Sequence, residues 1–229
     1  KWNWFRISVV TATCVIGVTL LAALGVAGSY VFLAPSLPSS ADMRNVELAV
    51  PLRVYTRGGQ LVAQIGEQRR IPVTYEQIPA TVREAFLAAE DDRFFRHHGI
   101  DYAGVLRAAA VNLFTGNRAQ GASTITMQVA RNLFLWPGGG APRKALEIPL
   151  ALALDALWPK WRILEVYLHI AEMGPGIFGA EAAARSHFGV PAARLGRAQA
   201  ALIAAVLPSP IRWSAAEPSE YVRGRARAI

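Results

Sequence analysis

A long run of apolar positions dominates the start of the chain. Residues 7–33 are almost continuously apolar, and no charged residue lies between Arg6 and Asp42. A helix of that length extends about 40 Å, which is enough to cross a hydrocarbon core of about 30 Å. Lys1 and Arg6 precede the run, so the positive-inside rule places the N-terminus in the cytoplasm. The pattern predicts one uncleaved transmembrane anchor; a cleaved signal peptide is the alternative, but no strong cleavage site follows.

Beyond this run the pattern changes, first to a linker and then to strict alternation. Residues 35–40 are rich in proline and serine, and such a composition is typical of a linker. We therefore divide the chain into residues 1–40, with a cytoplasmic stub, anchor and linker, and a domain over 41–229. Apolar residues alternate on both sides of a turn signal at 57–60. This alternation predicts a β-hairpin within 51–70.

After Pro72 the apolar positions repeat with the period of an α-helix. Val82, Ala85, Phe86 and Ala89 follow the i, i+3, i+4, i+7 pattern and predict a helix that ends at Glu90. Similar patterns predict helices over residues 102–114, 123–134, 160–173, 180–188 and 197–207. The fold class is therefore mainly α with one small β element.

Two of the prolines between the third and fourth of these helices bear on a further helix. Pro142 is suited to the first turn of another helix. Pro149 lies further along the same stretch, where it removes a backbone hydrogen bond at a cost of about 3 kcal/mol. It predicts a kink, or a helix whose start is delayed to that point.

Composition and charge narrow the classes of function. The apolar fraction of 53% excludes a disordered chain, and a single cysteine excludes a disulfide scaffold or a cysteine-based zinc site. The net charge of +8 is compatible with nucleic acid, anionic lipid or a phosphate-bearing substrate. The predicted export topology and the absence of a run of five basic residues argue against nucleic acid.

The first candidate cluster lies at the end of the helix after Pro72. Glu90, Asp91 and Asp92 are followed by two phenylalanines and two histidines. Acidic residues are unfavourable at a helix C-terminus, so their presence there indicates a site. Surface charges at a helix end are the alternative. A metal site of His and Asp is only weakly supported, because no His-x-x-x-His pair occurs.

The second cluster surrounds the start of the helix predicted over 123–134. Ser123 and Thr124 are candidate N-caps, and their hydroxyls together with the first backbone N–H groups could hold a phosphate. Gln128, Arg131 and Asn132 follow on the same helix. An ordinary N-cap is the alternative.

The third cluster combines two cations with a carboxylate. Arg143 and Lys144 precede Glu147 by four and three residues, so the three side chains share one helix face. The cations keep the carboxylate ionised and are suited to a diphosphate. A surface salt bridge is the alternative. Residues 174–179 also match G-x-G-x-x-G, but they follow a predicted helix rather than a strand, which argues against nucleotide binding.

Together the three clusters resemble glycosyltransferase family 51, the peptidoglycan transglycosylases. The first motif is matched by Glu90, Asp91, Phe94, His97 and Gly99; the second by residues 121–134; the third by Arg143, Lys144 and Glu147 with residues 163–168 and 179–189. The resemblance covers about residues 50–225. Up to about residue 135 it is strongest to class A penicillin-binding proteins, and beyond that to monofunctional biosynthetic transglycosylases. Transpeptidase motifs are absent, so no cross-linking activity is expected of this chain.

The resemblance implies a lysozyme-like glycosyltransferase domain that polymerises lipid II into β-1,4 glycan, with inversion and release of undecaprenyl diphosphate. It implies that Glu90 is the general base, its pKa raised by the adjacent Asp91, and that Glu147 stabilises charge at the donor. Implied contacts to the diphosphate are Arg131, Asn132, Arg143 and Lys144. Residues implied to shape the substrate site are Ser123, Thr124 and Gln128. Asp91, Phe94 and His97 are also assigned to this site, and Phe94 and His97 are expected to support the loop after Glu90.

Cofactors, partners and location follow from the same resemblance. No cofactor is required, although Mg²⁺ or Mn²⁺ could bridge the carboxylates and the diphosphate. The expected partners are lipid II, the growing glycan, membrane lipid and cell-wall synthesis proteins, but not nucleic acid. The expected location is the inner membrane, with the domain on its periplasmic face. His169 stands where the family usually has asparagine.

Two other functions remain open. A lytic or hydrolytic muramidase would also depend on a glutamate, but it has no need of cations for a diphosphate. A membrane-anchored scaffold that binds lipid II without turning it over is the non-enzymatic alternative.

Overall fold

A computed structural model describes part of the chain in detail. The described residues are 6, 8–14, 16–17, 20, 24, 52–55, 61–65, 69–71, 73–115, 123–136, 138 and 140–229. The linker and the domain boundary at residue 40 lie outside them, as does most of the predicted anchor. Within the described residues, no helix has the length and apolar character needed to cross a membrane.

The strands form two small sheets. Strands β1 (Leu52–Tyr55) and β2 (Leu61–Ile65) pair in antiparallel register, which confirms the predicted hairpin. The second sheet has the order β3-β5-β4, with β3 (Arg69–Arg70) parallel to β5 (Ile177–Phe178) and β4 (Glu172–Gly174) antiparallel to it. The sequence did not predict this sheet.

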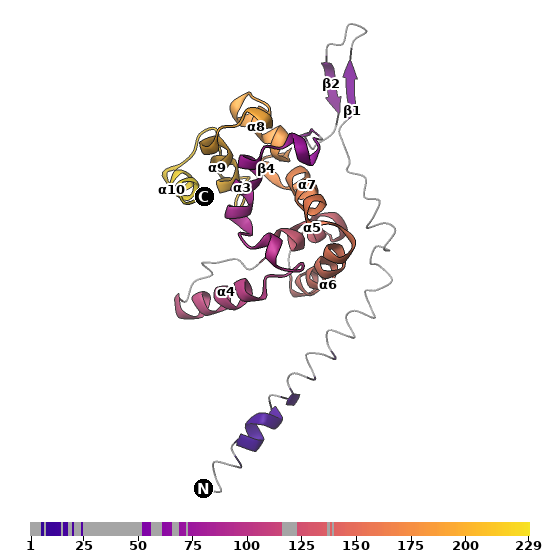
Figure 1. Ribbon diagram of the computed structural model, residues 1–229, viewed down its shortest axis with the longest axis vertical. Coiled ribbons are helices and arrows are strands. Elements are labelled where there is room, and N and C mark those ends of the chain that lie inside the picture. Colours follow the sequence, from indigo (N-terminus) through magenta and orange to yellow (C-terminus); the bar gives the residue numbers. More distant parts are fainter. Residues whose placement is uncertain are drawn as a thin grey trace.

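Helices make up most of the described chain (Figure 1), so the mainly-α prediction is confirmed. They are α3 (Ala80–Glu90), α4 (Tyr102–Thr115), α5 (Ile125–Phe134), α6 (Ala141–Leu157), α7 (Lys160–Ile170), α8 (Ala180–Phe188), α9 (Arg197–Val206) and α10 (Glu220–Ala228), with 3₁₀ turns η2 (Tyr75–Gln77), η3 (Phe94–Arg96) and η4 (Ala192–Arg194). The predicted helix over 160–173 ends early, at Ile170, because the chain then enters β4. Helix α10 was not predicted. This mainly helical architecture with a small antiparallel sheet fits the expected lysozyme-like domain.

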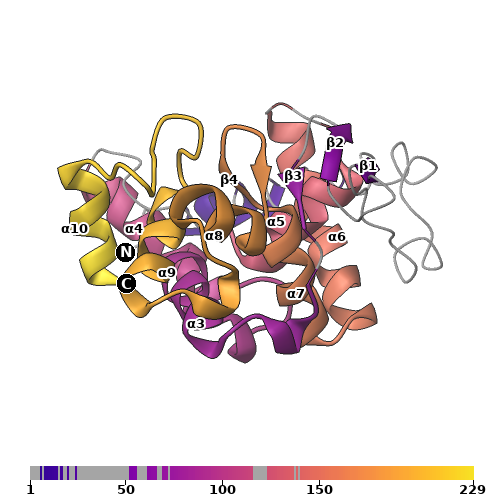
Figure 2. The same ribbon diagram turned by 90° about the horizontal axis from the view of Figure 1, so that it is seen from above.

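The core is centred on α7, which lies between the other helices. Every residue from 163 to 170 is buried, as expected of a helix that is covered on all sides. Helix α5 packs against α6 and α7, and α9 packs against α3 and α10. Figure 2 shows α10 at one end of this assembly and α6 at the other.

Close packing on α7 explains one glycine of the G-x-G-x-x-G match. Gly179 has φ of +86°, and a Cβ atom there would lie 2.9 Å from the carbonyl oxygens of Leu168 and His169. Gly176 lies in the tight turn between β4 and β5, where its N–H donates to Glu172. These glycines therefore serve packing and turn geometry, which agrees with the expectation that the segment is not a nucleotide-binding loop.

Helix α6 corrects one expectation about Pro149. The helix begins at Ala141, with Pro142 in its first turn, and continues through Pro149 to Leu157. A start delayed to Pro149 is therefore wrong. Leu146, Leu150 and Leu154 are buried at i, i+4, i+8, and their burial on both sides of the proline offsets the lost hydrogen bond. The predicted kink stays a prediction.

His169 fastens the segment before α3 to α7. Its Nε2 atom accepts a hydrogen bond of 2.9 Å from the backbone N–H of Val73, and its Nδ1 atom lies 2.7 Å from the carbonyl oxygen of Glu165. Because a carbonyl only accepts, Nδ1 carries the proton and the buried ring is neutral. The residue that departs from the family pattern thus has both ring nitrogens paired.

Candidate active site

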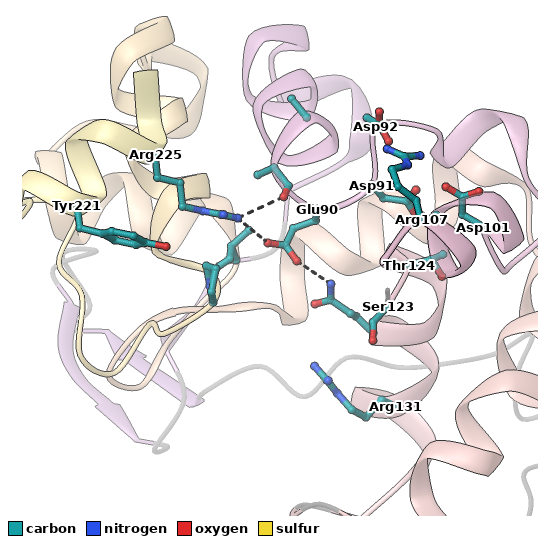
Figure 3. A pocket seen from close by; sticks show the side chains of 16 residues that line it. Glu90, Asp91, Asp92, Asp101, Arg107, Ser123, Thr124, Arg131, Tyr221 and Arg225 are labelled. Atoms are coloured by element: carbon teal, nitrogen blue, oxygen red, sulfur yellow. Dashed lines mark hydrogen bonds and ion pairs between the residues drawn. The ribbon is translucent and has the colours of Figure 1, made fainter. Parts of the chain in front are cut away.

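A cavity of about 760 Å³ lies between the end of α3, the first half of α4, α5 and α10 (Figure 3). Its lining includes the predicted site residues Glu90, Asp91, Ser123, Thr124, Gln128 and Arg131. These residues come from two regions about 30 residues apart in the sequence. Because the fold brings both regions to one cavity, their grouping into one site is supported. Of the other predicted residues, Phe94, His97, Asn132, Arg143, Lys144 and Glu147 do not line this cavity.

Glu90, the last residue of α3, is held on two sides. Its Oε2 atom accepts a hydrogen bond of 2.9 Å from Nε2 of Gln128, and its Oε1 atom lies 3.6 Å from Nη2 of Arg225. The same guanidinium donates to the carbonyl oxygen of Ala89 over 3.3 Å. Figure 3 shows the carboxylate between these two partners. Each carboxylate oxygen therefore has a partner at the cavity wall.

The pKa of Glu90 is raised, and burial is the largest cause. The hydrogen bond from Gln128 and the charges of Arg225 and Arg131 lower it, and the charge of Asp91 makes the smallest contribution, an upward one. The predicted direction is confirmed, and the predicted cause is present, but it is not the main one. Desolvation rather than the neighbouring carboxylate dominates, because burial removes the water that stabilises the charged form.

Asp91 is buried and ties three segments together. Its two oxygens lie 2.9 and 3.0 Å from Nε2 of His97, and Oδ2 also accepts a hydrogen bond of 3.0 Å from the backbone N–H of Ile125. Phe94 is buried beside His97, and Nζ of Lys160 lies 4.6 Å from its ring centre. This geometry agrees with a supporting position for Phe94 and His97 behind the wall of the cavity.

Two of the backbone N–H groups in the first turn of α5 are already bonded within the protein, so they do not contribute to the expected phosphate cradle. Thr124 is the N-cap and accepts from the N–H of Met127 over 3.1 Å, while its hydroxyl donates to the carbonyl oxygen of Gly99 over 2.6 Å. The N–H of Ile125 is already bonded to Asp91. These two amides are therefore not available to an anion.

Glu147 and Lys144 form the second charged group, in the first turns of α6. Glu147 is buried, and Nζ of Lys144 lies 2.6 Å from its Oε2 atom and 2.7 Å from Oγ of Ser123. Nε of Arg143 lies 3.9 Å from Oε1. The predicted shared helix face is present, and Lys144 connects it to Ser123 at the cavity wall.

Arg131 and Asn132 differ in position. Arg131 lines the cavity and is close enough to lower the pKa of Glu90. Asn132 is exposed, and its Oδ1 accepts a hydrogen bond of 3.2 Å from Nε of Arg131. Asn132 therefore contacts a lining residue, Arg131, but does not itself line the cavity.

Ten of the sixteen lining residues were not predicted as site residues, among them Arg107 on α4, and Tyr221 and Arg225 on α10. Ser219 accepts from the N–H of Val222 as an N-cap, and Glu220 follows it. This local signal could have predicted the helix. It could not have predicted that Arg225 faces a carboxylate far away in the sequence.

No group of three or more His, Cys, Asp or Glu side chains able to hold a metal occurs in the described part of the chain. The carboxylate of Asp91, next to Glu90, is hydrogen-bonded to His97 and to the backbone N–H of Ile125. The expectation that no cofactor is required, and that Mg²⁺ or Mn²⁺ could bridge the carboxylates and the diphosphate, stays a prediction.

The arrangement offers two kinds of chemistry on either side of α5. A largely buried carboxylate with a raised pKa is a stronger proton acceptor than an exposed glutamate. Arg131, together with Lys144 beside Ser123, offers positive charge to an anion. A reaction that removes a proton from a hydroxyl while an anionic group departs fits both.

Comparisons with known proteins agree with one another. The model of the family described as Transglycosylase matches residues 58–229. A biosynthetic peptidoglycan transglycosylase of Pseudomonas aeruginosa is 53% identical over 156 residues, which cover 68% of this chain and 67% of that protein. One of Rhodospirillum centenum is 51% identical over 163 residues, covering 71% of this chain and 69% of that protein.

The chain is also similar to a longer protein. Penicillin-binding protein 1A of Escherichia coli (strain K12) is 44% identical over 201 residues, which cover 88% of this chain but 23% of that protein. The chain thus spans under a quarter of the length of this relative and about two thirds of the length of the transglycosylases.

Proposed function

The chain belongs to the transglycosylase family, and from this premise we propose that it is a peptidoglycan glycosyltransferase that polymerises lipid II into β-1,4 glycan. The observation that carries the proposal is the position of Glu90. It is a desolvated carboxylate with a raised pKa, in the same cavity as the cationic Arg131. The relatives named as biosynthetic peptidoglycan transglycosylases support the substrate class.

In the proposed reaction Glu90 is the general base. It takes the proton from the 4-hydroxyl of the acceptor sugar while that oxygen forms a bond to the anomeric carbon of the donor. The bond from this carbon to the diphosphate breaks from the opposite face, and the diphosphate leaves with the electron pair. A base whose pKa is raised towards the working pH is a stronger proton acceptor.

The departing diphosphate would be bound by side chains from α5 and α6. Arg131 lines the cavity, and Lys144 reaches Ser123 at its edge. Charge-assisted hydrogen bonds from such groups stabilise the charge that develops on the leaving oxygen. Glu147 fixes Lys144 over 2.6 Å, so we assign it the role of stabilising positive charge at the donor and orienting the cation.

The surface of α4 supports a location at a membrane. Leu106, Leu113 and Phe114 are 72%, 80% and 87% exposed, and Figure 1 shows α4 extending from the lower edge of the helical body. Exposed apolar side chains on one helix are unusual in a soluble monomer. We propose that residues 7–33 anchor the chain in the inner membrane with its N-terminus inside, and that α4 meets the outer leaflet, where the lipid-linked substrate lies.

A hydrolytic muramidase is the second candidate, since the family is expected to have a lysozyme-like fold. Glycoside hydrolases place two carboxylates around the scissile bond. Here the second carboxylate, Glu147, is buried against Lys144, an arrangement that favours an anionic leaving group over hydrolysis.

Incubation of the protein with lipid II, and separately with preformed glycan, tests the proposal. Growth of glycan from lipid II with release of undecaprenyl diphosphate is the expected result. Shortening of preformed glycan without growth would point to a hydrolase. Binding of lipid II without either reaction would support the scaffold.

A further inference from the structure

Tyr221 is the one aromatic residue among the sixteen that line the cavity in the described part of the chain. Its side chain is 62% exposed. The other lining residues are charged, polar, small or aliphatic. An aromatic ring that is largely exposed at a polar cavity has no role in the hydrophobic core, and therefore its contact with a ligand has to be considered.

The ring is held by a neighbour. Its centre lies 5.1 Å from the ring of Trp213 at an interplanar angle of 47°, and Trp213 packs against the core. Tyr221 also precedes Arg225 by one helical turn, so both side chains leave the same face of α10. Figure 3 shows the hydroxyl of Tyr221 directed towards Arg225 and Glu90. The ring is thus positioned before any ligand arrives.

A saccharide is the ligand class that this surface fits. A pyranose has faces made of C–H groups and edges made of hydroxyls, and a tyrosine offers an apolar face with a polar tip. A tyrosine has few rotatable bonds, so contact with it costs little conformational entropy. Leu207 and Pro208 add apolar surface to the lining of the same cavity. The adjacent guanidinium of Arg225 can donate to sugar oxygens.

The position relative to Glu90 selects the part of the substrate. Figure 3 places Tyr221 and Arg225 on one side of Glu90, and Ser123 and Arg131 on the other. The side with Ser123 and Arg131 has the cations assigned to the donor diphosphate. The first side is therefore left for the sugar whose hydroxyl Glu90 deprotonates, or for the sugar joined to it.

We propose that Tyr221, supported by Trp213, is a sugar-stacking residue that binds a pyranose ring of the acceptor saccharide beside Glu90. This inference rests on the proposed function and extends it to a specificity-determining contact. The contact involves no bond formation, so it acts on acceptor binding and leaves the chemical step to Glu90.

The test uses the full chain and four variants. Tyr221→Ala removes the ring, Tyr221→Leu replaces it with an aliphatic side chain, and Tyr221→Phe removes only the hydroxyl. Ile211→Ala is the matched control, because Ile211 is 60% exposed in the same C-terminal region and does not line the cavity. Thermal unfolding verifies that each variant is folded. The readouts are kcat and KM for lipid II polymerisation, and the Kd of a soluble peptidoglycan tetrasaccharide measured by calorimetry.

Loss of the ring is expected to raise KM and the tetrasaccharide Kd by roughly three- to tenfold, with kcat nearly unchanged. Tyr221→Leu should raise KM and Kd as much as Tyr221→Ala does, whereas both values for Tyr221→Phe should stay within about twofold of wild type. Ile211→Ala should match wild type. Wild type that polymerises lipid II but binds no tetrasaccharide, equal Kd values for Tyr221→Ala and wild type, or a loss in Tyr221→Phe equal to that in Tyr221→Ala would overturn the stacking role. Wild type that makes no glycan would instead contradict the proposed function.

Discussion

Gln128 donates a hydrogen bond of 2.9 Å to the carboxylate of Glu90, which joins the end of α3 to α5. Ser123, just before the same helix, accepts from Lys144 over 2.7 Å. Helix α5 therefore lies between the candidate base and the cationic group that holds Glu147. Small shifts of this helix would alter both groups at once, which makes its contacts the natural place to perturb the site.

Replacement of Gln128 by methionine should raise the pKa of Glu90 further, because this hydrogen bond lowers it. A base is active when deprotonated, so activity is lost as the pH falls through its pKa. The acid limb of the profile of kcat/KM against pH should therefore move to higher pH, while the rate at the alkaline plateau changes little. An acid limb at the wild-type position would show that the amide does not act on the base.

Replacement of Arg225 by methionine should act in the same direction, because its charge also lowers the pKa of Glu90. The loss of activity should be larger at pH 6 than at pH 8, and Arg225→Lys should restore part of it. Arg223 is an exposed arginine on the same helix and does not line the cavity, so Arg223→Met is the matched control. Equal losses in the two methionine variants would assign the effect to net charge on α10 rather than to the contact with Glu90.

Removal of the Asp91 carboxylate should destabilise the fold. Asp91→Ala leaves His97 and the N–H of Ile125 without their partner, and breaking a buried charged contact of this kind costs about 3 kcal/mol. Denaturant unfolding measures the change in free energy. Asp92 is an exposed neighbour, so Asp92→Ala should stay within about 0.5 kcal/mol of wild type. Equal unfolding free energies for the two variants would show that the contacts of Asp91 do not stabilise the fold.

Tyr167 has a buried hydroxyl with no hydrogen-bond partner among the described residues. Burial raises the pKa of this phenol well above its usual value, and the charge of Glu90 raises it further. Tyr167→Phe deletes an unpaired buried polar group and should stabilise the protein by about 1 kcal/mol. Tyr102→Phe, at an exposed position, should have no effect on the unfolding free energy. Destabilisation by Tyr167→Phe would mean that the hydroxyl is bonded in solution.

The elements that the sequence predicted well are those with local signals. The apolar period before Glu90 and the N-cap at Thr124 gave helices α3 and α5 close to their observed bounds. Strands β3 and β5 have two residues each, too few to show alternation. In α10 only Val222 is buried, so no apolar period indicates a helix there.

Contacts within the site were predictable where both residues belong to one sequence motif. Contacts between residues far apart in the sequence were not predictable. The spacing of Arg143, Lys144 and Glu147 gave their shared face directly. The pairing of Arg225 with Glu90 joins helices that are far apart in the sequence, and only the packing of α10 on α9 and of α9 on α3 brings them together. The main cause of the raised pKa at Glu90 was missed for the same reason, because burial is a property of the assembled fold.

The central claim is that Glu90 is the general base of glycan polymerisation, and Glu90→Gln tests it most directly. Glu84 is an exposed glutamate on the same helix, so Glu84→Gln is the matched control. With lipid II as substrate, we expect Glu90→Gln to remain folded and to lose at least about a hundredfold in the rate of glycan formation, while Glu84→Gln keeps the wild-type rate. Glycan formation by Glu90→Gln at the wild-type rate would contradict the account.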